Sequence, residues 1–229
     1  MKVNNGSKRF EELDSLRGII AFTVFVYHFF NVSWENRGQV GYWNIIAYSP
    51  LRILWAGHEA VIFFFILSGF VLSLPFYKKN YIHNYITFII KRSLRIYFPF
   101  IVAVLLGIIL RGVFSLNNIA GTWTGESGLN TIIKHILFIG TYNSNAFDSV
   151  IWSLVHEMRI SLVFPLLIML LIKFEWKKIM TLGFLTSVIS IAFIVTLKID
   201  NNINIIISFH YILMFIIGAI LAKKSCSFS

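Results

Sequence analysis

The sequence predicts an all-α fold, a polytopic transmembrane bundle of about six spanning helices with one interfacial or re-entrant segment. Three observations predict it. Of the 229 residues, 57% are hydrophobic and only 13% are charged, whereas soluble domains carry about 25% charged residues. The mean hydropathy is +0.77. Six apolar runs are also long enough to cross a hydrocarbon core, which needs roughly 20 residues per helix.

The predicted spans make up a single domain over residues 1–229. They cover residues 13–33, 57–76, 96–115, 151–172, 179–198 and 203–222. The first is interpreted as a helix rather than a signal peptide, because it lacks a small-residue cleavage pattern and is long enough to span. The run 131–142 is too short to span and contains Lys134 and His135, which predicts an interfacial or re-entrant segment.

Basic residues are distributed unevenly between the two sides of these spans. One side, with the amino terminus, the 77–95 loop and the carboxyl terminus, collects 14 of the 20 Lys and Arg residues. They are Lys2, Lys8, Arg9, Arg17, Lys78, Lys79, Lys91, Arg92, Arg95, Lys173, Lys177, Lys178, Lys223 and Lys224. By the positive-inside rule, this side faces the cytoplasm. At this hydropathy, the formal charge of +10 indicates membrane lipid with anionic headgroups as a partner, and no nucleic acid.

The first predicted helix carries two ionisable side chains inside an apolar span. Arg17 and His28 are eleven residues apart, which places them on one helical face, about 16 Å apart along the axis. Such groups are costly in a membrane and indicate function unless a partner explains them. The pair suits an anionic group held at the inner mouth and proton transfer deeper in. Alternatively, Arg17 anchors the helix at the cytoplasmic surface and His28 bonds to a neighbouring helix.

The fourth predicted span begins with an unusually polar stretch, residues 151–159. Within it, Glu157 could act as a base, as an acid, or as the group that orients a histidine from another helix. The alternative is that Arg159 or Arg111 compensates the charge of Glu157. In either case the carboxylate should face the interior of the bundle rather than lipid.

A basic cluster precedes the third predicted span. Arg92 and Arg95 are three residues apart, so they share a helical face and could grip phosphate with forked hydrogen bonds. Alternatively, the cluster only sets the topology. In the second predicted span, Ser68 and Gly69 indicate close helix packing. A nucleophilic role of Ser68 is disfavoured, because no base lies near it in sequence.

Neither a disulfide nor a metal site is predicted. The single cysteine, Cys226, lies in the polar tail, so an internal disulfide or a Cys-based metal site cannot form. No pair of histidines shows convincing ligand spacing. His58 and Glu59, at the mouth of the second predicted span, form a secondary candidate for a polar site.

Four motifs follow one another along the chain. They are Leu13-Asp14-Ser15-Leu16-Arg17-Gly18 leading to Tyr27-His28, then Phe64-Phe65-Ile66-Leu67-Ser68-Gly69-Phe70, then Arg92-Ser93-Leu94-Arg95-Ile96-Tyr97, then Trp152-Ser153-Leu154 with Glu157 and Phe164-Pro165. In this order and spacing they resemble the signature of the membrane-bound acyltransferase-3 family, the O-antigen acetylase-like proteins of bacteria. The resemblance runs from about Leu13 to Ala222, and it implies a multi-pass protein of the bacterial cell (inner) membrane.

The resemblance implies an enzyme, an acyltransferase. Its reaction moves an acyl group, usually acetyl, from acyl-CoA to a hydroxyl of a cell-surface carbohydrate or related acceptor. Acyl-CoA is a donor substrate in this scheme, and no bound cofactor is implied. Carried over residue by residue, the family's motifs imply catalytic roles for His28, as general base, and for Glu157 and Arg17.

The same motifs imply binding residues for the two substrates. Family members commonly carry an acidic residue before the paired phenylalanines of the second helix. Here Ile62 stands at about that position, and Glu59 is the acidic residue that could take its role. The implied donor-binding residues are Arg92, Arg95 and Arg17, and the predicted substrate-binding residues are Trp152, Glu59 and Ser68.

The chain is short for this resemblance. Family members usually have helices beyond the sixth, so a short or truncated member is expected, with a partner that supplies the missing helices. Two alternatives stay open at this point. One is a non-catalytic fragment that needs such a partner, and the other is a small membrane transporter whose buried Arg, His and Glu residues line a polar path.

Overall fold

A computed structural model describes residues 11–37, 49–77, 84–114, 128–137, 146–147, 151–199 and 204–227. These residues are almost entirely helical, and none of them lies in a strand. The α-helices are α1 (Glu11–Arg37), α3 (Gly57–Ser73), α4 (Tyr85–Phe114), α5 (Leu129–Leu137), α6 (Ile151–Lys173), α7 (Trp176–Thr196) and α8 (Ile205–Ser227). Two short 3-10 helices, η1 (Pro50–Trp55) and η2 (Leu74–Tyr77), flank α3.

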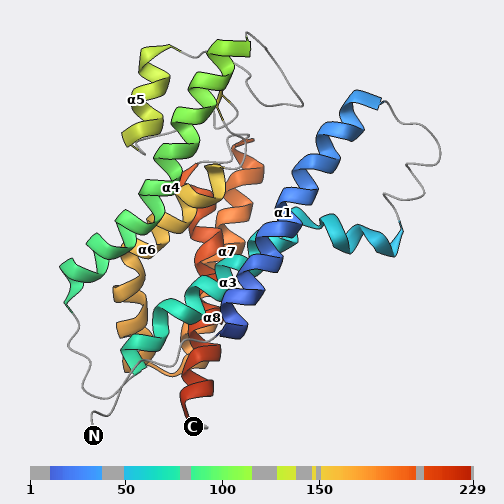
Figure 1. The fold of residues 1–229 in the computed structure, drawn as a ribbon. Coiled ribbons are helices and arrows are strands. Elements are labelled where there is room, and N and C mark those ends of the chain that lie inside the picture. Colours follow the sequence, from blue (N-terminus) through green and yellow to red (C-terminus); the bar gives the residue numbers. More distant parts are fainter. Residues whose placement is uncertain are drawn as a thin grey trace, which may run out of the picture.

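Six helices are long and apolar enough to cross a membrane, namely α1, α3, α4, α6, α7 and α8. The predicted all-α transmembrane bundle is therefore confirmed. α5 has only nine residues, too few to span, and residues 138–142 of the segment predicted there lie outside the described part of the chain. Figure 1 shows the start of α1 and the end of α8 at the same end of the bundle, as an even number of crossings requires.

α4 begins earlier than the sequence predicts. Its first residue is Tyr85, so the basic residues of the predicted 77–95 loop that follow it lie on the helix itself. Apolar residues are interspersed with the basic ones here, and a helix can place the two kinds on different faces. The start of α4 is capped by Asn84, whose side-chain oxygen accepts a hydrogen bond from the backbone N–H of Thr87 at 3.1 Å, which satisfies one of the terminal donors.

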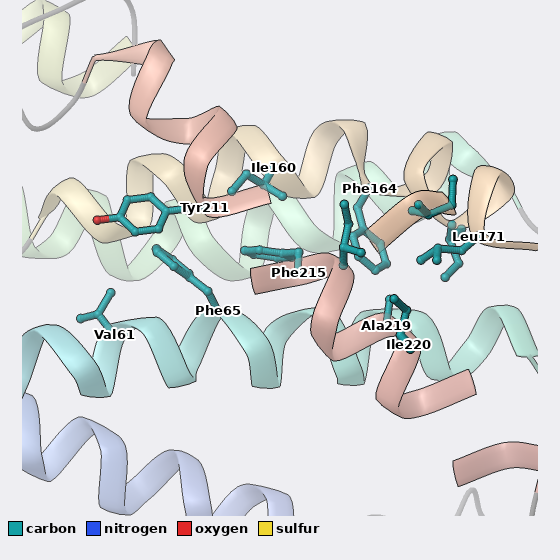
Figure 2. Packing of buried hydrophobic residues seen from close by; sticks show 12 residues of the cluster. Val61, Phe65, Ile160, Phe164, Leu171, Tyr211, Phe215, Ala219 and Ile220 are labelled. Carbon is teal, nitrogen blue, oxygen red and sulfur yellow. The ribbon is translucent and has the colours of Figure 1, made fainter. Parts of the chain in front are cut away.

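The hydrophobic core lies where α3, α6 and α8 meet. Figure 2 shows side chains from all three helices packed against one another. Phe65 of α3 and Phe164 of α6 lie on either side of Phe215 of α8, with ring centroids 5.7 and 6.1 Å from the Phe215 ring. All three rings are fully buried. Between helices in lipid, such close packing, and not the release of water, provides the attraction.

Glycines allow α3 and α8 to approach each other closely. A Cβ atom on Gly69 would lie 2.3 Å from the carbonyl oxygen of Phe215, and one on Gly218 would lie 2.0 Å from the carbonyl oxygen of Ile66. No side chain fits at such distances, since the obstacle is backbone on both sides. The interpretation of Gly69 as a residue of close helix packing is therefore confirmed.

α1 lies at the edge of the bundle, where it leans on α3 (Figure 1). Only 6% of its spanning segment is buried, against 50% for α6. Tyr27 packs directly onto Gly57, where a Cβ would come within 2.4 Å of its ring. Phe30 stacks on Trp55 of η1, with the ring centroids 4.5 Å apart. These contacts join the second half of α1 to η1 and to the start of α3.

Candidate active site

A polar network lies between α3, α4 and α6. Glu157 of α6, with 5% of its side chain exposed, forms an ion pair with Arg92 of α4, whose side chain is 10% exposed. Ser68 of α3 donates a hydrogen bond to the same carboxylate oxygen, Oε1, at 3.1 Å. Arg92 Nε donates to the hydroxyl of Ser161 on α6, also at 3.1 Å. The buried carboxylate is therefore both paired and hydrogen-bonded, as burial of a charge requires.

The helix register explains how this network forms. Glu157 and Ser161 are four residues apart on α6, so they share one face and a single arginine can reach both. Ser68 is 1% exposed, and its short side chain brings a donor to Glu157 without separating α3 from α6. Glu157 faces the interior of the bundle, as the sequence predicts.

The structure corrects the alternative in which Arg159 or Arg111 compensates the charge of Glu157. The partner is Arg92. Residues two apart on a helix point to different faces, which separates Arg159 from the carboxylate. Arg111, five turns further along α4, donates from Nη1 to the backbone carbonyl of Ala146 at 2.9 Å. The ion pair therefore joins α4 to α6 and is not a local compensation.

Beside this network, a basic pocket opens between the end of α3 and the start of α4. Its volume is about 260 Å³. Arg17 of α1 lies within electrostatic reach of Arg95 and Glu157, and its own guanidinium is 3.7 Å from the carboxylate of Asp14. The structure thus brings together Arg17, the arginines of α4 and Glu157. The pocket is lined by Leu72, Asn84, Thr87, Phe88, Lys91, Arg92 and Arg95.

His28 lies on α1 and is half-buried. Its ring meets the ring of Tyr27 edge to face, with the centroids 5.2 Å apart. Since Tyr27 packs on Gly57, His28 lies in the turn of α1 that contacts the start of α3. It is about 16 Å along the helix from Arg17. The role of His28 in proton transfer stays a prediction.

A second polar cluster lies between α6, α7 and α8. His156 Nδ1 and the hydroxyl of Ser208 are 2.8 Å apart, and so are His210 Nδ1 and the hydroxyl of Ser187. Sequence reasoning missed this cluster because its members come from three helices and no spacing links them. The available signal was that both histidines lie within apolar spans. Among the described residues, no group of three or more His, Cys, Asp or Glu side chains could hold a metal ion.

Trp152 lies between this second cluster and the start of α3. Its ring stacks on that of His58 with an interplanar angle of 23° and a centroid distance of 6.1 Å. On α6 and α8, the rings of His156 and Tyr211 lie 6.1 and 6.0 Å from it. Glu59 is exposed in the first turn of α3, next to His58 in sequence. Trp152 and Glu59 therefore lie toward the amino-terminal end of α3, away from the basic pocket.

The fold and the site define a multi-pass membrane protein that holds a buried ion pair next to a basic pocket. A family model described as an acyltransferase domain matches residues 10–225 of the chain. The chain therefore belongs to the acyltransferase-3 family, and it is a membrane acyltransferase. The predicted family and enzyme class are confirmed, which favours the enzyme over the transporter. No curated protein and no solved structure matches the chain.

Proposed function

We propose that this protein is a membrane-embedded O-acyltransferase that moves an acyl group, in the first instance acetyl, from acyl-CoA to a hydroxyl of a cell-surface carbohydrate or related acceptor. One observation supports this most directly. The basic pocket between α3 and α4 opens beside the buried pair of Arg92 and Glu157. A pocket suited to an anionic donor therefore lies next to a fixed carboxylate, and the protein belongs to an acyltransferase family.

Acyl-CoA suits this pocket because its phosphates complement the basic wall. Lys91, Arg92 and Arg95 line the pocket, and guanidinium groups match phosphate oxygens with forked hydrogen bonds. Arg17 lies within electrostatic reach of Arg95 and adds to the positive potential there. In this proposal the pantetheine arm extends from the pocket into the bundle, toward His28. Acyl-CoA is a substrate, and the proposal includes no bound cofactor.

His28 is the general base of the proposed reaction. It accepts the proton of the acceptor hydroxyl while that oxygen attacks the thioester carbonyl. The C–O bond of the new ester forms, the C–S bond breaks, and His28 passes the proton to the leaving CoA thiolate. General-base catalysis contributes about 10² to 10⁴-fold, and holding both substrates in place contributes further. An acyl-histidine intermediate is a second route to the same products.

Glu157 positions the acceptor in this proposal. Its carboxylate is fixed by Arg92 and Ser68, and a charged oxygen is a strong hydrogen-bond acceptor for an alcohol. Trp152 and Glu59 contact the rest of the acceptor near the start of α3. Support for this comes from their location at the opposite end of α3 from the basic pocket, which leaves each substrate its own approach.

The proposed setting is the bacterial cell (inner) membrane, with the amino and carboxyl termini in the cytoplasm. The excess of Lys and Arg on one side of the spans supports this orientation. The basic pocket includes the first turns of α4, which belong to the same side, so a cytoplasmic donor could enter it directly. A partner chain with further helices stays a prediction.

The test is transfer of acetyl label. Membranes that contain the protein are incubated with acetyl-CoA labelled in the acetyl group, and label in the envelope polysaccharide fraction is measured. We expect transfer by the wild type and a loss of at least about 100-fold in His28→Gln and His28→Ala at equal expression. Lys134→Gln, which changes an exposed residue on α5 outside the site, is the control and should keep the activity. Transfer by His28→Ala at the wild-type rate would exclude His28 as the base, and no transfer by the wild type would exclude the proposed reaction.

A further inference from the structure

We propose that the basic run on α4 divides into two functions: Arg92 is a positioning residue that holds Glu157, whereas Lys91 and Arg95 together bind the phosphates of the donor. The inference rests on the proposed function and concerns the same pocket. The spacing in the sequence predicts Arg92 and Arg95 as an equivalent pair of phosphate-binding residues. In this proposal, Arg92 is instead the buried partner of Glu157, and the exposed Lys91 and Arg95 form the phosphate clamp. Lys91 belongs to none of the motifs that point to the family.

The side chain of Arg92 is committed to the interior of the bundle. Its Nη2 is paired with Glu157, and its Nε donates to Ser161 at 3.1 Å. Only 10% of the side chain is exposed. To bind a phosphate through these atoms, Arg92 would have to leave Glu157 as an uncompensated buried charge, which is strongly unfavourable. Arg92 therefore forms part of the pocket wall, while its Nη2 and Nε donors are engaged with Glu157 and Ser161.

Lys91 and Arg95 have the opposite character. Both residues are exposed, and both line the basic pocket. They are four residues apart on α4, so they lie on one face about 6 Å apart along the axis. Thr87, one turn before Lys91, also lines the pocket and continues the same row. Two exposed cationic side chains at this spacing can contact one phosphate group or two neighbouring ones. Arg17 lies within electrostatic reach of Arg95.

If the two functions are divided in this way, loss of Lys91 or Arg95 changes the Kd for the donor, whereas loss of Arg92 changes kcat. The two constants can be measured separately. The purified protein in lipid nanodiscs is titrated with acetyl-CoA in the absence of acceptor, and kcat is measured separately with acceptor. Lys91→Gln and Arg95→Gln should each raise the Kd for acetyl-CoA about tenfold, since each removes a charged hydrogen-bond donor. Arg92→Gln should change Kd by less than about twofold and lower kcat about 100-fold. Lys178→Gln, which changes an exposed lysine on α7 outside the pocket, is the matched control and should leave both values unchanged.

A second variant guards against loss of folding when the ion pair is broken. Arg92→Met combined with Glu157→Leu removes both charges, and apolar replacement of a buried pair is tolerated better than loss of one member. This double variant should bind acetyl-CoA with a Kd close to the wild-type value and should lack transfer. In kcat, the losses caused by Arg92→Gln and Glu157→Gln should be far from additive, because both act through one group.

Three results would overturn the inference. The first is a rise of Kd in Arg92→Gln, or in the double variant, as large as that in Arg95→Gln. The second is unchanged acetyl-CoA binding in Lys91→Gln. The third is additivity of the Arg92→Gln and Glu157→Gln effects on thermal unfolding, which needs no donor. If the wild type does not bind acetyl-CoA, the donor in the proposed function is wrong and so is the phosphate clamp, whereas non-additive unfolding would still support the positioning role.

Discussion

α1 and α6 carry most of the residues proposed for catalysis, yet the bundle holds them in different ways. Half of the spanning segment of α6 is buried, and Glu157 is fixed there by an ion pair and a hydrogen bond. Only 6% of the α1 segment is buried, and its contacts include Tyr27 on Gly57, Phe30 on Trp55 and Val24 against the core. The carboxylate of the site is thus part of the core, while the proposed base is half-buried on a helix at the edge of the bundle.

The largest effect is expected at the close contact between α3 and α8, the two helices that form the core together with α6. Gly218→Val should prevent formation of the native bundle or destabilise it by at least about 4 kcal/mol, because its Cβ would lie 2.0 Å from the carbonyl oxygen of Ile66. Thermal unfolding of the protein in detergent measures this. Gly112→Val on α4 is the control, since no atom lies within 4 Å of a Cβ there, and it should be close to wild type. A well-folded Gly218→Val protein would contradict the close approach of α3 and α8.

The next largest effect is expected for α6 itself. Glu157→Ala leaves the buried guanidinium of Arg92 without its partner and should cost about 3–5 kcal/mol of stability. The free energy of unfolding in detergent is the measurement. Glu175→Ala, at an exposed position before α7, should be nearly neutral. A loss below about 1 kcal/mol for Glu157→Ala would show that the ion pair is more hydrated than its burial indicates.

α1 should respond differently, with more loss of activity than of stability. In Gly57→Ala, the added Cβ would lie 2.4 Å from the ring of Tyr27, so α1 must shift on α3. We expect a destabilisation of about 1–2 kcal/mol and at least a tenfold fall in acyl transfer, because a displacement of about 1 Å can cost 100-fold in rate. Gly18→Ala, also on α1 but with no atom within 4 Å, is the control. Full activity in Gly57→Ala would show that the position of α1 does not control the reaction.

The smallest effect is expected in the second polar cluster. Ser208→Ala removes the hydroxyl that is 2.8 Å from His156 Nδ1, and hydrogen bonds between membrane helices contribute about 0.6 kcal/mol on average. A change of this size in the free energy of unfolding should be measurable in detergent. A loss several times larger would mean that His156 depends on Ser208 for more than one interaction.

The spans could be predicted from sequence because length and hydropathy alone decide which helices can cross. The start of α4 could not be predicted in this way, because Lys91 and Arg92 are charged and hydropathy assigns charged residues to a loop. In the structure Arg92 is stabilised in the helix by Glu157 and Ser161, and these partners are known only once α4 and α6 are placed side by side.

Individual residues of the site could also be predicted from sequence, but their contacts with one another could not. The resemblance singled out Glu157 and Arg92 separately, and it gave them different roles. That they form a pair depends on tertiary packing across 65 residues of sequence. The hydrogen bond between His156 and Ser208 was missed for the same reason. Spacing along one helix predicts which residues share a face, but it carries no information about the helix that this face will meet.

The close approach of Gly69 and Gly218 has a consequence for biosynthesis. These residues are 149 positions apart (218 minus 69), and ribosomes add about 5–20 residues per second, so α3 enters the membrane roughly 7–30 seconds before α8 emerges. During that interval α8 is not available to pack against Gly69. The close contact between α3 and α8 therefore forms only after α8 has been synthesised, well after α3 has entered the membrane.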